Sequence, residues 1–288
     1  MLRSFRLGTA FGIPLYVHST FLLLPLFALA MSWPAGPAGV LFSQAVLLTI
    51  FACVLLHELG HALMARLFGI PTRDITLYPI GGVARLDSTG HRPHEEIAIA
   101  LAGPAVNLGI ALLLSPVVAA LALAGAAIGP DAVVHGAGPL HLFATYLTMV
   151  WVGNLVLMAF NLIPAFPMDG GRVLRAFLSL GLGQLRATEV AAAVGLVLAV
   201  LLGAAGLFQG VPSLVLVAVF VAVVGQLELH ALRQRQARER LRAESEPVVE
   251  VLAPVRIPPG LGGFTGFVWD RHNQVWVRWV NGRPVEVR

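Results

Sequence analysis

Long apolar segments alternate with short polar connections over the first 230 residues of the chain. A helix needs roughly 20 apolar residues to cross the hydrocarbon layer of a bilayer. Six segments satisfy this requirement, at residues 13–32, 40–68, 95–124, 140–163, 187–208 and 211–230. The pattern therefore predicts an all-α polytopic membrane protein, with about six transmembrane helices in a domain that covers residues 1–230.

The pattern changes after residue 230. Residues 231–246, ALRQRQARERLRAESE, are highly charged and predict a helical linker that lies against acidic headgroups. Residues 247–288 contain β-branched and aromatic runs, and Asn281-Gly282 is typical of a tight hairpin turn. We therefore expect a small cytoplasmic β-rich domain, a C-terminal cap, over residues 247–288.

Composition supports the membrane assignment. Hydrophobic residues make up 57% of the chain and charged residues only 12%, whereas about 25% of a soluble domain is charged. The basic residues are all arginine, and they occur before the first predicted helix, in alternate connections and after the last helix. Arginine is retained on the cytoplasmic side, so we predict a multi-pass protein of the cell membrane with both termini in the cytoplasm. Because the arginines follow a topology and form no basic face, we expect no nucleic-acid partner.

The segment FACVLLHELGHALMARLFGI, residues 51–70, places ionisable side chains inside the second apolar segment. His57, Glu58 and His61 form H-E-x-x-H, and on a helix this spacing brings both imidazoles to one face as a chelating pair for zinc. Glu58 can then take a proton from a water at the metal and deliver it to a leaving amine. The alternative is two hydrogen-bonded histidines and an ion pair between Glu58 and Arg66. Ionisable groups are costly within a membrane, which favours the functional interpretation.

A catalytic zinc ion held by two histidines needs a third protein ligand. Glu95 and Glu96 are available, but they lie in a polar run where we expect a solvated surface. Asp169 is the better candidate, because the prolines and glycines of NLIPAFPMDGGR, residues 161–172, break the fourth helix and can turn a carboxylate inward. The alternative is a helix end at which Asp169 pairs with Arg172. The predicted ligands of one zinc ion per chain are His57, His61 and Asp169.

Three motifs, in this order, resemble those of a known family. H-E-L-G-H in the second segment, G-P-x-x-N in the third and N-x-x-P-x-x-P-M-D-G-G at the end of the fourth are similar to the site-2 protease family of intramembrane zinc metalloproteases, in its six-span branch. The resemblance covers roughly residues 10–180. It implies that His57, His61 and Asp169 bind zinc and that Glu58 activates water. It also implies hydrolysis of a peptide bond within or near a transmembrane helix of the substrate.

Between the second and third segments, DITLYPIGGVARLDS alternates apolar and polar residues around Gly81 and Gly82, as a hairpin does. The segment resembles a membrane-associated sheet of the site-2 protease family, so we predict a short membrane-associated β-hairpin. A hairpin edge near the active site can pair with an unwound substrate by strand addition. A plain loop is the alternative.

Other polar residues in the apolar helices are candidates for supporting roles. Asn161 lies near the predicted break, and we assign it a catalytic role in stabilising an oxyanion, although it can equally bridge helices. For Asn107 we expect packing or support of a ligand, with Gly103 and Gly109 allowing close approach of helices. His18 either lines the cavity or is hydrogen-bonded within the bundle.

The predicted function is that of a zinc-dependent intramembrane endopeptidase, acting in regulated proteolysis. Its predicted partners are a membrane-spanning protein substrate and the lipid bilayer, and no oligomeric state is assigned. Two alternatives remain open. The intact Glu58 argues against a catalytically silent scaffold or chaperone, and clustering of the ligands at one depth argues against a divalent metal transporter.

Overall fold

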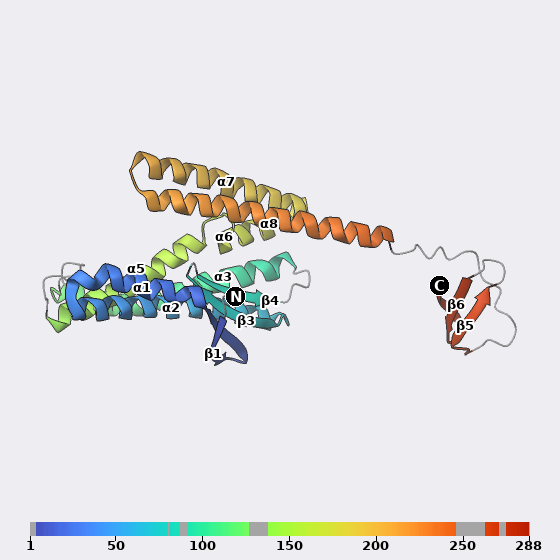
Figure 1. Ribbon diagram of the computed structural model, residues 1–288, viewed down its shortest axis with the longest axis horizontal. Helices are drawn as coiled ribbons and strands as arrows, with labels where there is room; N and C mark the ends of the chain where they lie inside the picture. The colour runs from blue at the N-terminus through green and yellow to red at the C-terminus, as the bar shows by residue number, and fades with distance from the viewer. Residues whose placement is uncertain are drawn as a thin grey trace. The chain divides into compact units, whose positions relative to one another are not determined.

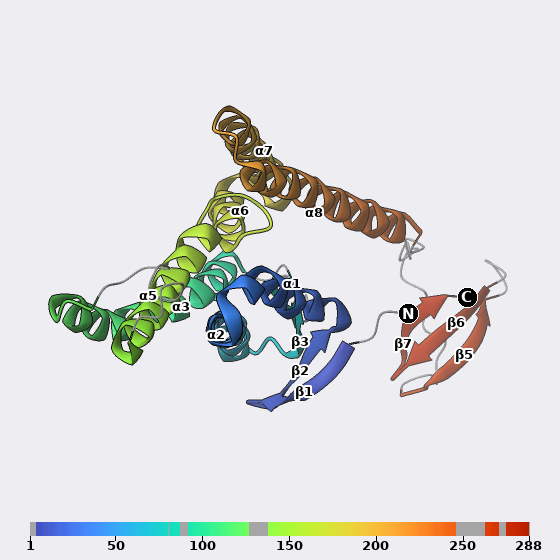
Figure 2. The same ribbon diagram turned by 60° about the vertical axis from the view of Figure 1, so that its left-hand side comes forward.

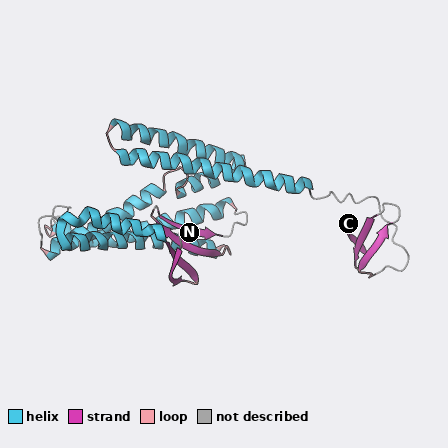
Figure 3. Ribbon diagram, in the orientation of Figure 1, coloured by secondary structure: helices cyan, strands magenta, loops and turns pink. Residues whose placement is uncertain are grey.

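The computed structural model describes residues 4–79, 81–86, 92–126, 138–245, 263–270 and 275–287. The chain divides into two compact units, Met1–Leu232 and Arg233–Arg288. Helices dominate the first unit, which also contains a small sheet (Figure 3). Residues 247–262 of the predicted C-terminal cap, and residues 87–88 at the end of the predicted hairpin segment, lie outside the described residues.

The first unit opens with strands. β1 (Ser4–Ala10) pairs antiparallel with β2 (Ile13–His18), β2 pairs in parallel with β3 (Thr72–Tyr78), and β3 pairs antiparallel with β4 (Gly81–Leu86). The strand order in the sheet is therefore β1-β2-β3-β4. The predicted hairpin around Gly81 and Gly82 is confirmed as β3 and β4, but it forms only half of a larger sheet.

The predicted first transmembrane helix, 13–32, is wrong in its first part. Residues 13–18 are strand β2, a 3-10 turn follows, and α1 covers only Leu23–Ser32. Ten residues of α-helix rise about 15 Å, which is half of a hydrocarbon layer of roughly 30 Å. α1 alone is therefore too short to cross a membrane.

The helices between residues 23 and 161 lie side by side (Figures 1 and 2). α1 packs on α2 (Gly36–Leu67), and α3 (Pro93–Leu123) packs on both α2 and α5 (Pro139–Asn161). α1 and α2 are antiparallel: the Gln44 amide donates to the Pro25 carbonyl, and the Phe21 and Phe51 rings meet edge to face. α6 (Asp169–Leu182) packs on α3 and on α7 (Gln184–Phe208), and α8 (Pro212–Ser245) follows.

Within the described residues, five helical segments are long and apolar enough to cross a membrane. They are Ser19–Leu67, Pro93–Leu123, Pro139–Asn161, Gln184–Phe208 and Pro212–Ala231. The first contains both α1 and α2, on either side of a turn at Trp33–Ala35. The predicted count of six is therefore not confirmed, because α1 does not count as a span of its own.

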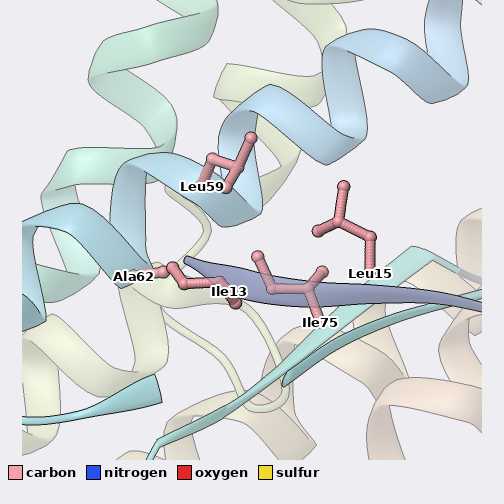
Figure 4. Close-up of a cluster of buried hydrophobic side chains, with 5 residues drawn as sticks. All are labelled: Ile13, Leu15, Leu59, Ala62 and Ile75. Carbon is pink, nitrogen blue, oxygen red and sulfur yellow. The ribbon is translucent and has the colours of Figure 1, made fainter. Parts of the chain in front are cut away.

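The sheet is fixed to α2 by a buried apolar cluster (Figure 4). Ile13 and Leu15 of β2 and Ile75 of β3 contact Leu59 and Ala62 of α2. These α2 residues belong to the same helical turns as the H-E-x-x-H motif. The cluster therefore places the sheet directly against the helix segment that carries the motif.

The second unit contains a three-stranded antiparallel sheet of β5 (Gly266–Asp270), β6 (Val275–Val280) and β7 (Arg283–Val287). Val277 and Trp279 are buried, whereas Trp276 is exposed, as expected for alternation along β6. The turn predicted at Asn281-Gly282 joins β6 to β7, and both residues have the positive φ angles of a type I′ turn.

Candidate metal centre

The three predicted ligands meet in one buried cluster. His57 and His61 lie one turn apart on α2, and Asp169 is the first residue of α6. Asp169 Oδ2 lies 3.2 Å from Nε2 of each histidine, and the two Nε2 atoms are 3.1 Å apart. None of the three residues is more than 7% exposed. His57, His61 and Asp169 are the one set of three potential metal ligands found close together among the described residues.

The spacing of the three ligand atoms fits zinc. A tetrahedral zinc ion with bonds of about 2.0 Å places its ligand atoms about 3.3 Å apart. The three observed separations of 3.1–3.2 Å match one face of such a tetrahedron. Two imidazole nitrogens and one carboxylate oxygen are also a usual donor set for catalytic zinc, which leaves the fourth position open.

Both imidazoles are oriented through their second ring nitrogen. His61 Nδ1 lies 2.7 Å from the Ile99 carbonyl oxygen, so Nδ1 carries the proton and the Nε2 lone pair faces the cluster. His57 Nδ1 lies 3.2 Å from the amide nitrogen of Asn107, whose buried Oδ1 has no partner. Turning this amide over lets Oδ1 accept a hydrogen bond from His57 Nδ1–H, which satisfies the oxygen and frees Nε2 for zinc. Asn107 thus supports a ligand, as predicted.

Gly103 gives the imidazoles their space on α3. A Cβ atom at this position would lie 2.7 Å from His57 Nε2 and would overlap the His61 ring. Only a residue without a side chain is compatible with both rings here. The predicted similar role of Gly109 is wrong, because a Cβ atom there would meet nothing within 4 Å.

The P-M-D-G-G motif brings Asp169 to the cluster by a tight turn. Added Cβ atoms on Gly170 and Gly171 would collide with backbone atoms of the preceding loop; at Gly171 the nearest is 2.6 Å away. The two glycines therefore let α6 begin directly against this loop. The prediction that Asp169 turns inward is confirmed, although Arg172 also lies 4.0 Å from its other oxygen, Oδ1.

The adjacent imidazoles keep Asp169 ionised. Burial raises the pKa of its carboxyl, but the neighbouring His57 and His61 rings lower it by more, so the pKa lies below the usual range of a carboxyl. The residue therefore presents a carboxylate, which is the form that binds a metal ion.

Glu58 lies between the metal ligands and the sheet. It follows His57 on α2, and a Cβ atom added to Gly82 of β4 would lie 3.1 Å from its Oε1. The absence of a side chain at Gly82 leaves room for the carboxylate. The β4 strand therefore passes directly over Glu58.

Asn161 and His18 have local partners. The Asn161 amide donates to the Leu157 carbonyl of its own helix at 2.9 Å, and the catalytic role of Asn161 stays a prediction. The His18 ring stacks on Tyr78, with ring centroids 5.0 Å apart, and its Nδ1 lies 2.7 Å from Thr20 Oγ1. These contacts favour the hydrogen-bonded interpretation of His18.

The expectation of a solvated surface is wrong for Glu96. It is 8% exposed and forms an ion pair with Arg175 of α6. The spacing of Glu96, Gly103 and Asn107 along α3, by seven and then four residues, places them on one helical face and could have indicated its burial.

Residues 45–202 match the model of peptidase family M50. The chain belongs to this family, the site-2 protease family. A zinc metalloprotease of Methanocaldococcus jannaschii is 33% identical over 259 residues, which cover 90% of this chain and 69% of that protein. Stage IV sporulation protein FB of Bacillus subtilis is 31% identical over 144 residues, 49% of this chain and 43% of that protein.

The M50 assignment also has structural support. A solved structure, the site-2 protease from Methanocaldococcus jannaschii, is similar with a TM-score of 0.56 and 35% identity, over 79% of this chain and 95% of that chain. This M50 protein is thus a zinc metallopeptidase with a multi-pass arrangement of apolar helices. Membership favours the peptidase over the scaffold and transporter alternatives.

Proposed function

We propose that this M50 peptidase hydrolyses peptide bonds in or near the transmembrane segments of membrane-tethered proteins. The observation that carries the proposal is the buried site of His57, His61 and Asp169 among helices long enough to cross a membrane. A peptidase that acts on water-soluble substrates would not require an active site enclosed by apolar helices. A lipid-embedded substrate reaches it by lateral movement in the bilayer.

Glu58 acts as the general base and acid in this proposal. When held by His57, His61 and Asp169, zinc supplies Lewis acidity that polarises the scissile carbonyl and acidifies water. Glu58 follows His57 directly, so its carboxylate can accept the proton of the attacking water and then deliver it to the leaving amine. Asn107 and the Ile99 carbonyl hold the imidazoles in the required orientation.

The β4 strand presents the substrate. A transmembrane helix hides its peptide bonds in its own hydrogen bonds, so the segment must be unwound before attack. Within the described sheet, β4 is an outer strand, paired with β3 alone. An extended segment that adds to β4 gains backbone hydrogen bonds and lies beside Glu58, because Gly82 contacts that side chain.

We also infer that the protein lies in the cell membrane with both termini in the cytoplasm, since the arginines gather in alternate connections. This topology needs an even number of crossings, so the α1–α2 hairpin must cross twice, with the bilayer thinned around α1. Cysteines introduced at Ser4 and at Arg288 should both react with a thiol reagent from the cytoplasmic side only. The native Cys53 is buried and gives a low background.

The test of the peptidase proposal is cleavage of a co-reconstituted membrane substrate by the wild-type protein and by Glu58→Gln, with zinc quantified in both. We expect Glu58→Gln to retain zinc and to lose cleavage. Glu95→Gln is the matched control, because Glu95 lies in an exposed helix cap and should leave cleavage unchanged. Equal cleavage by the wild type and Glu58→Gln, or a zinc-loaded wild type that cuts no membrane substrate, would contradict the proposal.

A further inference from the structure

A buried ion pair joins the two helices that meet at the metal centre. Arg175 of α6 donates from Nε to Glu96 Oε1 of α3 at 3.0 Å, and its Nη2 contacts the same oxygen. The side chains are only 15% and 10% exposed. A buried charge that loses its partner is strongly unfavourable, so this contact holds α3 and α6 in one relative position.

One face of α3 organises the histidine ligands. Ile99 accepts the hydrogen bond of His61, Gly103 makes room for both rings, and Asn107 contacts His57. These residues follow each other at intervals of four along the helix, which places them on one face.

Glu96 extends this face by one turn. It lies three residues before Ile99. Glu96 contacts α6 through Arg175, whereas the other residues of this face contact the histidines of α2. α3 therefore contacts both histidine ligands and also α6, the helix that begins with Asp169.

Arg175 lies on α6, after Asp169, and also contacts the loop that precedes Asp169. It lies on α6 six residues after Asp169, which corresponds to about 9 Å along the helix. Its guanidinium also lies over the ring of Phe166, 5.4 Å from the centroid. Phe166 is buried in the loop that leads into Asp169. One side chain thus links α3, the start of α6 and the loop before it.

We propose that Glu96 and Arg175 are positioning residues that set the distance between the Asp169 carboxylate and the two histidines. A functional metal site needs its ligand distances to within about 0.2 Å. The chain separates His57 and Asp169 by 112 positions, so this precision must come from contacts between helices. The inference rests on the zinc centre and makes no use of the substrate or the base.

The direct test is the zinc affinity of Glu96→Gln, measured by competition with a chromogenic chelator on the purified full chain. We expect the dissociation constant to rise about 10–100-fold, as is usual when a group that orients a ligand is lost. Glu95→Gln is the matched control: the same change on the adjacent residue, whose side chain caps the helix in solvent, should leave the affinity at the wild-type value.

Cobalt substitution gives a readout of ligand geometry. Co²⁺ bound to the wild type should show the intense visible absorption of a tetrahedral site, and the Glu96→Gln spectrum should be weaker and shifted. In the double variant Glu96→Gln with Arg175→Gln, the rise in the zinc dissociation constant should be smaller than the product of the two single effects, because both substitutions remove the contact between Glu96 and Arg175. Multiplication of the two single effects would show independent roles and overturn the proposal.

Folding must be separated from positioning. Thermal unfolding of the metal-free variants, followed by circular dichroism, reports the folded fraction independently of zinc. Zinc binding at wild-type affinity by Glu96→Gln would overturn the proposal. A loss of zinc that only parallels a loss of folded protein would overturn it as well, since the pair would then serve stability alone.

Discussion

Replacing Gly103 with alanine adds one methyl group at the narrowest point of the metal centre. The new Cβ atom would lie 2.7 Å from His57 Nε2, whereas ordinary contacts of a carbon atom begin at 3.4 Å. The His57 ring must therefore move by about 0.7 Å, and the His61 ring, which the Cβ atom overlaps, must move further; both shifts exceed the tolerance of about 0.2 Å in a metal–ligand distance. We expect the zinc dissociation constant to rise by about 100-fold or more, at the upper end of what loss of a supporting contact costs.

The same substitution should not weaken the helix. Alanine is favoured over glycine in a helix interior by about 1 kcal/mol, and this gain offsets part of the steric cost of the added methyl group in the metal-free protein. Gly109→Ala is the matched control: it lies on the same helix, and its Cβ atom would meet nothing within 4 Å. Zinc affinity by chelator competition and thermal unfolding without metal should be measured for both variants.

The two variants should differ in zinc affinity and not in folding. If Gly103→Ala binds zinc as tightly as Gly109→Ala and the wild type, then α3 does not confine the imidazoles, and the close approach of Gly103 has no role in metal binding. If both variants lose zinc affinity equally, the loss results from a general change in α3 and not from contact with the imidazoles.

Two further substitutions test the surroundings of the site. Asn107→Leu keeps the size of the side chain but removes the acceptor for His57 Nδ1–H, so the zinc dissociation constant should rise about 10–100-fold in chelator competition; unchanged affinity would exclude the proposed orientation of the amide. Gly82→Ala places a methyl group 3.1 Å from Glu58 Oε1 and should lower the rate of substrate cleavage about 10–100-fold while zinc content stays complete. Loss of zinc from Gly82→Ala would show that β4 supports the metal and not the base.

Local chemistry was predictable from the sequence because it depends on helix geometry. The spacing of His57 and His61 determines that both rings share one face of α2, and no distant contact is needed for that conclusion. Asp169 was found through the prolines and glycines that surround it, whose backbone effects are also local. The structure brings all three together as expected.

Non-local pairing was not predictable in the same way. The run IPLYVHSTFLLLPL is largely apolar, and periodicity cannot separate a buried strand from a buried helix in such a run. Residues 13–18 become a strand because they pair with β3, which lies two helices further along the chain. The helical spacing of Glu96 can indicate its burial, but its partner Arg175 is 79 positions away, and no local pattern marks that contact.

The separation of the ligands along the chain has a consequence for biosynthesis. Asp169 is made 112 residues after His57, which takes about 6–22 s at ordinary rates of protein synthesis. During that interval the nascent polypeptide has two imidazoles but no third ligand. The metallopeptidase thus emerges from the ribosome without a complete metal site, and the site can form only after Asp169 has been made.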